Sequence, residues 1–102
     1  MNVQKFNEIV AKQVKLSTDV LCSKAKEYAT EDRLHNFKVA GTLQDLTTRQ
    51  ALAGMMAKHT VSVYDMCMSN YDFPMAMWDE KITDHINYLL LLSAVIREDQ
   101  PE

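Results

Sequence analysis

Helix-breaking residues are scarce in this chain, and that scarcity limits its possible folds more than any other feature. The 102 residues include only 2 Gly and 2 Pro, whereas an all-β fold needs many turns and uses these residues to make them. Hydrophobic residues make up 47% of the sequence, enough for a folded core. The sequence therefore predicts an all-α fold: one domain over residues 1–102, a compact helical bundle of three long helices and one short helix.

Apolar residues recur at three- and four-residue steps over four segments, as they do on one face of a helix. The first long helix is predicted over about residues 2–28. We expect it to continue through the Ser-Thr-Asp segment at 17–19, although these residues could also cap a new helix. A short second helix follows and is predicted to end at Gly41.

Clear local signals mark the second half of the chain. Thr47-x-x-Gln50 is a capping box, and it predicts a third helix that runs to about Ser69. The sequence NYDFP then breaks the helical pattern. The last helix is predicted over about residues 76–97, with residues 97–102 as a frayed tail.

The last helix is nearly apolar on all sides after Asn87. Such a helix is usually buried on more than one side, and a chain of this length has few elements of its own to cover it. We therefore predict a homodimer or a higher oligomer.

Charge and cysteine content exclude several classes of protein. The net charge is −3 and the 11 basic residues are scattered, so no nucleic-acid partner is expected. The longest apolar run, Leu89 to Leu92, is far too short to cross a membrane, and the N-terminus has no signal-peptide core. Cys22 and Cys67 lie far apart and form no CxxC motif, so we predict buried, reduced thiols in a cytoplasmic protein.

A row of polar residues on the last helix is the first candidate for chemistry. Glu80 and Asp84 are four residues apart, and Asn87 continues the row three residues later. Stacked carboxylates repel each other, and a divalent cation such as Mg²⁺ would reverse that repulsion. The row could equally be a solvated helix face.

The sequence KEYATEDRLHNF, where the first helix is expected to end, is the second candidate. It gathers acidic residues, His35 and Asn36 in a connection without Gly or Pro. In an antiparallel bundle its carboxylates could complete a cage with those of the last helix; its residues could also simply cap the short helix. Lys58 on the third helix could meet a phosphate. The sequence contains no nucleophile elbow, P-loop or dinucleotide fingerprint.

The order KEY, HNF, GMMAKH and WDEKITDHINYLLLL resembles small phage and prophage proteins of unassigned role. More remotely, it is similar to the all-α nucleoside triphosphate pyrophosphatases, the MazG-like and dimeric dUTPase-like group. That resemblance implies an oligomeric bundle that binds a nucleotide together with Mg²⁺, which the carboxylates of the family hold on facing helices.

Carried over to this chain, the resemblance implies catalytic and metal-binding roles for Glu27, Glu80 and Asp84. The hypothesis of a nucleotide-binding protein adds substrate-binding roles for His35, Asn36, Lys58 and Asn87. The spacing differs from the family pattern, because Glu80 and Asp84 form E-x-x-x-D rather than E-x-x-D. The sequence therefore predicts one of two functions: a Mg²⁺-dependent nucleotide-binding protein with a possible pyrophosphohydrolase activity, or a non-catalytic helical interaction or assembly module.

Overall fold

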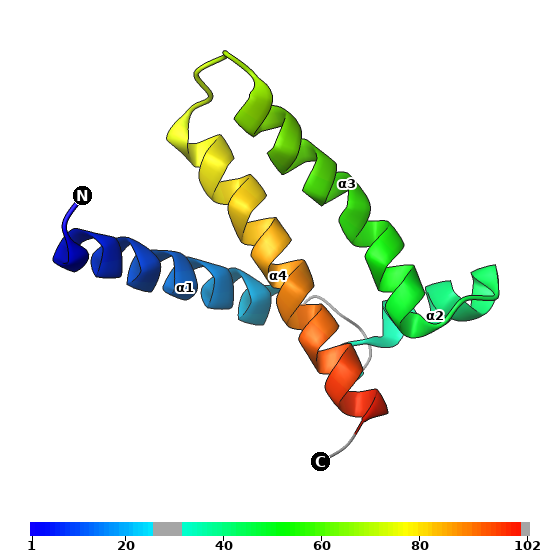
Figure 1. Ribbon diagram of the computed structural model, residues 1–102. Coiled ribbons are helices and arrows are strands. Elements are labelled where there is room, and N and C mark those ends of the chain that lie inside the picture. Colours follow the sequence, from blue (N-terminus) through cyan, green and yellow to red (C-terminus); the bar gives the residue numbers. More distant parts are fainter. Residues whose placement is uncertain (26–31, 101–102) are drawn as a thin grey trace.

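The computed structural model describes residues 1–25 and 32–100, and these residues form four α-helices and no β-strand (Figure 1). The helices are α1 (Val3–Ala25), α2 (His35–Gln44), α3 (Thr48–Met68) and α4 (Met75–Asp99). The predicted all-α bundle of three long helices and one short helix is confirmed. The predicted end of the first helix at residue 28 lies outside the described residues.

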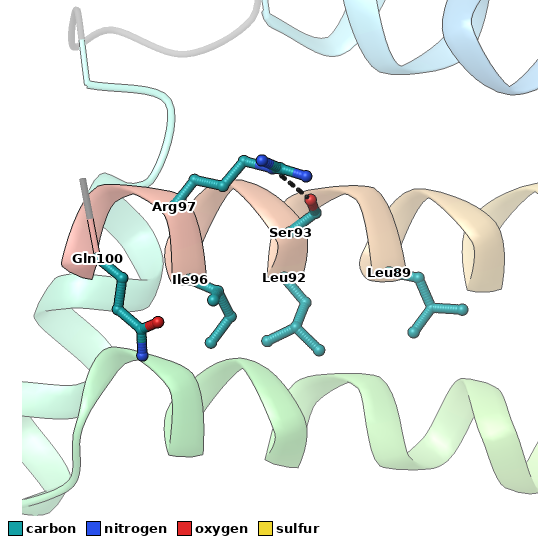
Figure 2. A pocket seen from close by; sticks show the side chains of 6 residues that line it. All are labelled: Leu89, Leu92, Ser93, Ile96, Arg97 and Gln100. Atoms are coloured by element: carbon teal, nitrogen blue, oxygen red, sulfur yellow. Dashed lines mark hydrogen bonds between the residues drawn. The ribbon is translucent and has the colours of Figure 1, made fainter. Parts of the chain in front are cut away.

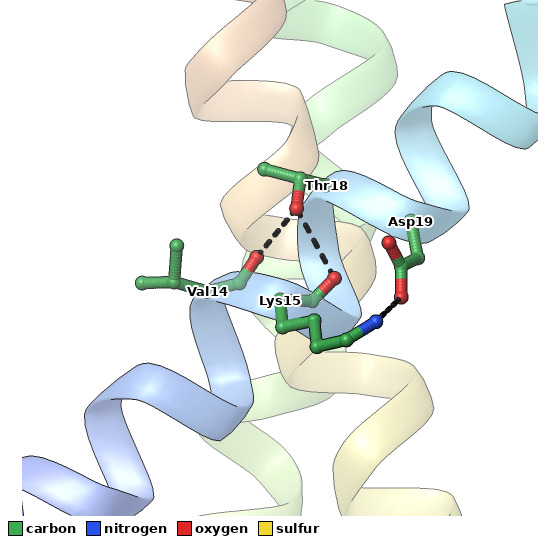
Figure 3. A network of polar contacts seen from close by, with 4 residues as sticks. All are labelled: Val14, Lys15, Thr18 and Asp19. Atoms are coloured by element: carbon green, nitrogen blue, oxygen red, sulfur yellow. Dashed lines mark hydrogen bonds and ion pairs between the residues drawn. The ribbon is translucent and has the colours of Figure 1, made fainter.

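α1 is one continuous helix through the Ser-Thr-Asp segment. The Thr18 hydroxyl donates to the backbone carbonyls of Val14, at 3.0 Å, and Lys15, at 3.1 Å, and the Lys15 ammonium pairs with Asp19 at 2.6 Å (Figure 3). A Thr that bonds back to the preceding turn fits inside a helix without capping a new one. The expectation of a single long helix is therefore confirmed.

Side chains cap the N-termini of α1 and α3. The Asn2 side chain accepts a hydrogen bond from the Lys5 backbone N–H at 2.8 Å. The predicted capping box is present, because Thr47 Oγ1 accepts from the Gln50 N–H at 3.1 Å and Gln50 Oε1 accepts from the Thr47 N–H at 3.0 Å. Both caps satisfy backbone donors that have no partner within the helix.

The prediction that Gly41 ends the short helix is wrong, because α2 continues to Gln44 and Asp45 takes the left-handed conformation that ends it (φ 56°). Gly41 has a different task. A Cβ atom at this position would lie 2.9 Å from the carbonyl oxygen of Leu46 and 3.1 Å from that of Thr47. Glycine therefore allows the α2–α3 connection to fold back closely over α2.

The break between α3 and α4 at residues 69–74 is confirmed, and aromatic side chains pack across it. The ring centroids of Tyr71 and Phe73 are 4.9 Å apart, and those of Phe73 and Trp78 are 5.9 Å apart, both edge to face. α4 starts directly after Pro74, and it reaches Asp99, two residues beyond its predicted end.

The apolar core lies where α2, α3 and α4 pack together. Its central residues are Leu34, Phe37, Leu52 and Val95. α1 is placed differently: it crosses α4, and its N-terminal half extends away from the other helices (Figure 1). The core that the described residues share is therefore small for a chain with this hydrophobic content.

Cys22 and Cys67 are free and exposed, so the prediction of buried thiols is wrong. Each lies in the last turn of its helix. Among the described helices, none is both long enough and apolar enough to span a membrane.

Candidate functional site

The candidate site is a cavity of about 200 Å³ to which all four helices contribute a side chain. The lining residues are Leu21 of α1, Arg33 just before α2, Phe37 of α2, His59 of α3, and Asp84, Asn87, Tyr88 and Leu91 of α4. The α4 residues are spaced by three, four and seven positions, which puts them on one face of the helix. Side chains that converge from facing helices are the usual way in which a bundle builds a ligand site.

Aromatic rings form one wall of this cavity. The Tyr88 ring lies 4.7 Å from the His59 ring at an interplanar angle of 36° and 6.4 Å from the Phe37 ring in an edge-to-face arrangement. These separations are normal for packed aromatic pairs. The imidazole of His59 is thus half-buried against Tyr88, and a planar molecule in the cavity would meet ring faces or ring edges.

Asn87 is a polar residue in an unusually buried position. It is only 6% exposed, and its side-chain oxygen Oδ1 has no hydrogen-bond partner among the described residues. Leaving a buried acceptor without a partner costs about 1–3 kcal/mol. Such groups are rare in folded proteins and call for a specific explanation, such as a bound water or a ligand.

The contact between α1 and α4 is also polar at its centre. Gln13 Nε2 donates to Thr83 Oγ1 at 2.9 Å and to Ser17 Oγ at 3.1 Å. Ser17 is 1% exposed and Thr83 is 3% exposed. We call Gln13, Ser17 and Thr83 the polar seam; Asn87 lies one turn further along α4, where the seam meets the cavity.

The predicted acidic row lies partly in the cavity and partly outside it. Asp84 is half-buried and lines both the cavity and a neighbouring groove of about 380 Å³ between α1 and α4. The exposed Glu80 and the half-buried Asp79 line only that groove. Of the sequence-predicted site residues, the structure therefore brings Asp84 and Asn87 together in the cavity and sets Glu80 one turn away.

The other predicted residues lie elsewhere. Lys58 is exposed on α3 and lines a separate hollow, which it shares with Tyr88. His35 and Asn36 are exposed in the first turn of α2. Glu27 lies outside the described residues. Of the substrate-binding residues predicted from the sequence, only Asn87 thus lines the cavity.

No group of three or more His, Cys, Asp or Glu side chains in residues 1–25 and 32–100 is arranged to hold a metal ion. The carboxylates of Asp84 and Glu80 are the described members of the predicted Mg²⁺ site, and oxygen donors of this kind do suit Mg²⁺. The metal site stays a prediction, because its third member, Glu27, is not among the described residues.

An electrostatic cluster outside the cavity holds the start of α2 against the end of α4. The Lys38 ammonium lies 2.6 Å from a carboxylate oxygen of Asp32 and 2.6 Å from one of Glu98. The hydrogen bond from Lys38, followed by that from the Leu34 N–H, lowers the pKa of Asp32. The same carboxylates, that of Asp32 first, raise the pKa of Lys38. The cluster fixes the turn that carries Arg33 into the cavity.

A further hollow of about 510 Å³ is a poor candidate because all of its lining residues come from α4 and the residue that follows it (Figure 2). In Figure 2, Leu89, Leu92 and Ile96 point from α4 toward α3. The polar pair of this hollow, Ser93 and Arg97, lies on another side of α4 and is joined by a hydrogen bond of 3.2 Å. Polar groups therefore do not converge here.

Sequence reasoning missed Arg33, Phe37, His59 and Tyr88 as site residues. Tyr88 could have been identified from the sequence, because Asp84, Tyr88 and Leu91 share one helical face. Comparison of the chain with known protein families, with curated proteins and with solved structures found no match. The resemblance to all-α pyrophosphatases therefore stays a prediction.

Proposed function

We propose that the protein binds a nucleotide or nucleoside, with the base in the cavity that the four helices line. The observation that carries this proposal is the convergence of an amide, a carboxylate, a guanidinium and aromatic rings on one small concave site. A nucleobase has flat apolar faces and a polar edge with both donors and acceptors. Aromatic walls and a few fixed polar groups are what such a molecule needs.

Size and charge favour the base over the phosphates as the occupant. The cavity, at about 200 Å³, is smaller than the roughly 300–1,000 Å³ of pockets that enclose drug-sized ligands. Arg33 and Asp84 bring opposite charges to its wall, so the cavity as a whole does not select for an anion. A nucleotide would therefore keep its phosphates outside, toward the groove where Glu80 and Asp84 could share a Mg²⁺ ion with them.

Asn87 is the group that we expect to read the base. Its amide supplies one donor and one acceptor side by side, which matches the polar edge of a nucleobase. A ligand contact would also compensate a polar group that is otherwise buried at a cost. The proposal concerns binding; hydrolysis of the bound nucleotide is a separate prediction that the family resemblance implies.

Thermal denaturation with a panel of nucleosides and nucleotides, each with and without Mg²⁺, tests this proposal. A ligand at 100 times its Kd stabilises the native state by about 2.7 kcal/mol, which raises the Tm of a chain of this size by roughly 10–20 °C. Asn87→Leu is expected to abolish the shift. Asn36→Ala, which changes an exposed amide outside the cavity, is the matched control and is expected to keep it.

Two outcomes would count against the proposal. If no nucleoside or nucleotide changes the Tm, the cavity does not bind this class of ligand. If Asn36→Ala abolishes the shift and Asn87→Leu keeps it, a ligand binds at the start of α2 instead. A shift that needs both Mg²⁺ and a triphosphate, and that Glu80→Gln removes, would support the metal part of the proposal.

A further inference from the structure

Residues 3–12 of α1 leave their large apolar side chains exposed in the described structure. α1 packs on α4 alone among the described helices, and it does so from Gln13 onward (Figure 1). Residues 3–12 are called the arm below. The large apolar side chains exposed along it are Val3, Phe6, Ile9 and Val10.

The arm continues the same helix face that docks on α4. Phe6, Val10, Ser17 and Leu21 follow one another at steps of four, seven and four residues, so they share one face. The ion pair of Lys15 and Asp19 lies on the opposite side of α1 (Figure 3), and Lys12, three residues before Lys15, shares that side. The helix is therefore amphipathic, but only part of its apolar face is covered.

The chain exposes more solvent-accessible surface than a compact monomer of its mass would. A compact monomer of 11.7 kDa would expose about 5,900 Å², whereas this chain exposes 7654 Å². Its radius of gyration is 15.8 Å, against about 13 Å for a compact chain of this length. The excess is thus on the order of 1,800 Å².

We propose that the arm packs against a second copy of this chain in a symmetric dimer. Burial of all of this excess by two chains sets an upper limit of about 3,600 Å² for the interface, and half of that area would already reach the size of a specific protein–protein interface. A second copy also supplies matching apolar surface, because its own arm exposes the same side chains, Phe6, Ile9 and Val10. The small net charge of −3 opposes self-association only weakly.

Light scattering coupled to size-exclusion chromatography, over the micromolar range, tests this proposal. The wild-type protein is expected to have twice the monomer mass of 11.7 kDa. The double variant Phe6→Asp with Val10→Asp puts charges on the arm and is expected to halve that mass. Leu43→Asp is the matched control, because Leu43 is 80% exposed on α2, away from the arm, and the dimer should persist.

If the double variant does not fold, the concentration dependence of the wild-type Tm decides the question. A dimer that is more stable than its monomer has a Tm that rises with protein concentration. A monomeric wild type, or a double variant that stays dimeric, would overturn the proposal. If a monomeric wild type binds to vesicles of anionic lipid and the double variant does not, the apolar face of the arm binds a membrane surface instead of a second copy.

Discussion

Replacing Asn87 with Leu should make the ligand-free protein more stable. Asn87 is 6% exposed, and its Oδ1 lacks a partner among the described residues, so the native side chain carries a desolvation cost of about 1–3 kcal/mol. Leucine removes that cost and adds apolar surface, and its greater volume can extend into the adjoining cavity. After allowance for some strain, we expect a gain of about 1–2 kcal/mol in the free energy of unfolding.

The matched control for this change is Thr83→Val, one turn away on the same helix. Thr83 is equally buried, but its hydroxyl oxygen accepts a hydrogen bond from Gln13 at 2.9 Å. Removing a satisfied hydroxyl should cost about 1 kcal/mol, the opposite sign to Asn87→Leu. Two buried polar residues on one helix face are thus predicted to respond in opposite directions.

Urea denaturation at a fixed protein concentration, followed by circular dichroism, measures both effects. At the m-value of about 1–3 kcal/mol/M that is typical of small proteins, a change of about 1 kcal/mol moves the urea midpoint by roughly 0.3–1 M. If Asn87→Leu destabilises the protein as much as Thr83→Val does, then Asn87 is already satisfied in the ligand-free state. Asn87 would then not be a residue that is kept for a ligand at a cost in stability.

Two further predictions come from the helices and from the charged cluster. Gly41→Ala should destabilise the protein, because the added methyl group would lie 2.9 Å from the carbonyl oxygen of Leu46. Gly54→Ala should instead stabilise α3 by about 0.5–1 kcal/mol, because a Cβ atom at that position has nothing within 4 Å. Equal effects of the two changes in urea denaturation would contradict the close approach at Gly41. Because the folded-state pKa of Asp32 is lowered, the stability that its carboxylate contributes is present above the ordinary pKa of 3.8 and is lost as the pH falls through the folded-state value. The Tm difference between the wild type and Lys38→Met should therefore shrink on acidification below that pH, and a difference that stays constant would exclude the ion pair as its cause.

Most of the helix boundaries were predicted correctly from local signals. The capping box at Thr47 and the break before Pro74 are encoded in a few neighbouring residues, and both are confirmed. Gly41 was misread because its purpose depends on a backbone segment that folds back over it, which no local pattern records. The helix end was set instead by Asp45, a residue type that tolerates the left-handed conformation.

The candidate site was less predictable, since it depends on packing between helices. The three-residue step from Asp84 to Asn87 placed both on one face of α4, and both do line the cavity. Nothing in the sequence indicated that Arg33 and His59 would meet them there, because these residues come from other segments of the chain. Glu80 belongs to the same row, but it lines the groove and not the cavity.

The polar seam determines where α1 sits on α4 more than how tightly it is held. Apolar side chains can slide past one another at little cost, because one methyl contact replaces another. The amide of Gln13 has no such freedom: a slip of one helical turn would separate it from Thr83 and leave both groups buried without their bond. Hydrogen bonding in the seam thus selects a single alignment of the two helices, and that alignment sets the direction in which the arm leaves the bundle.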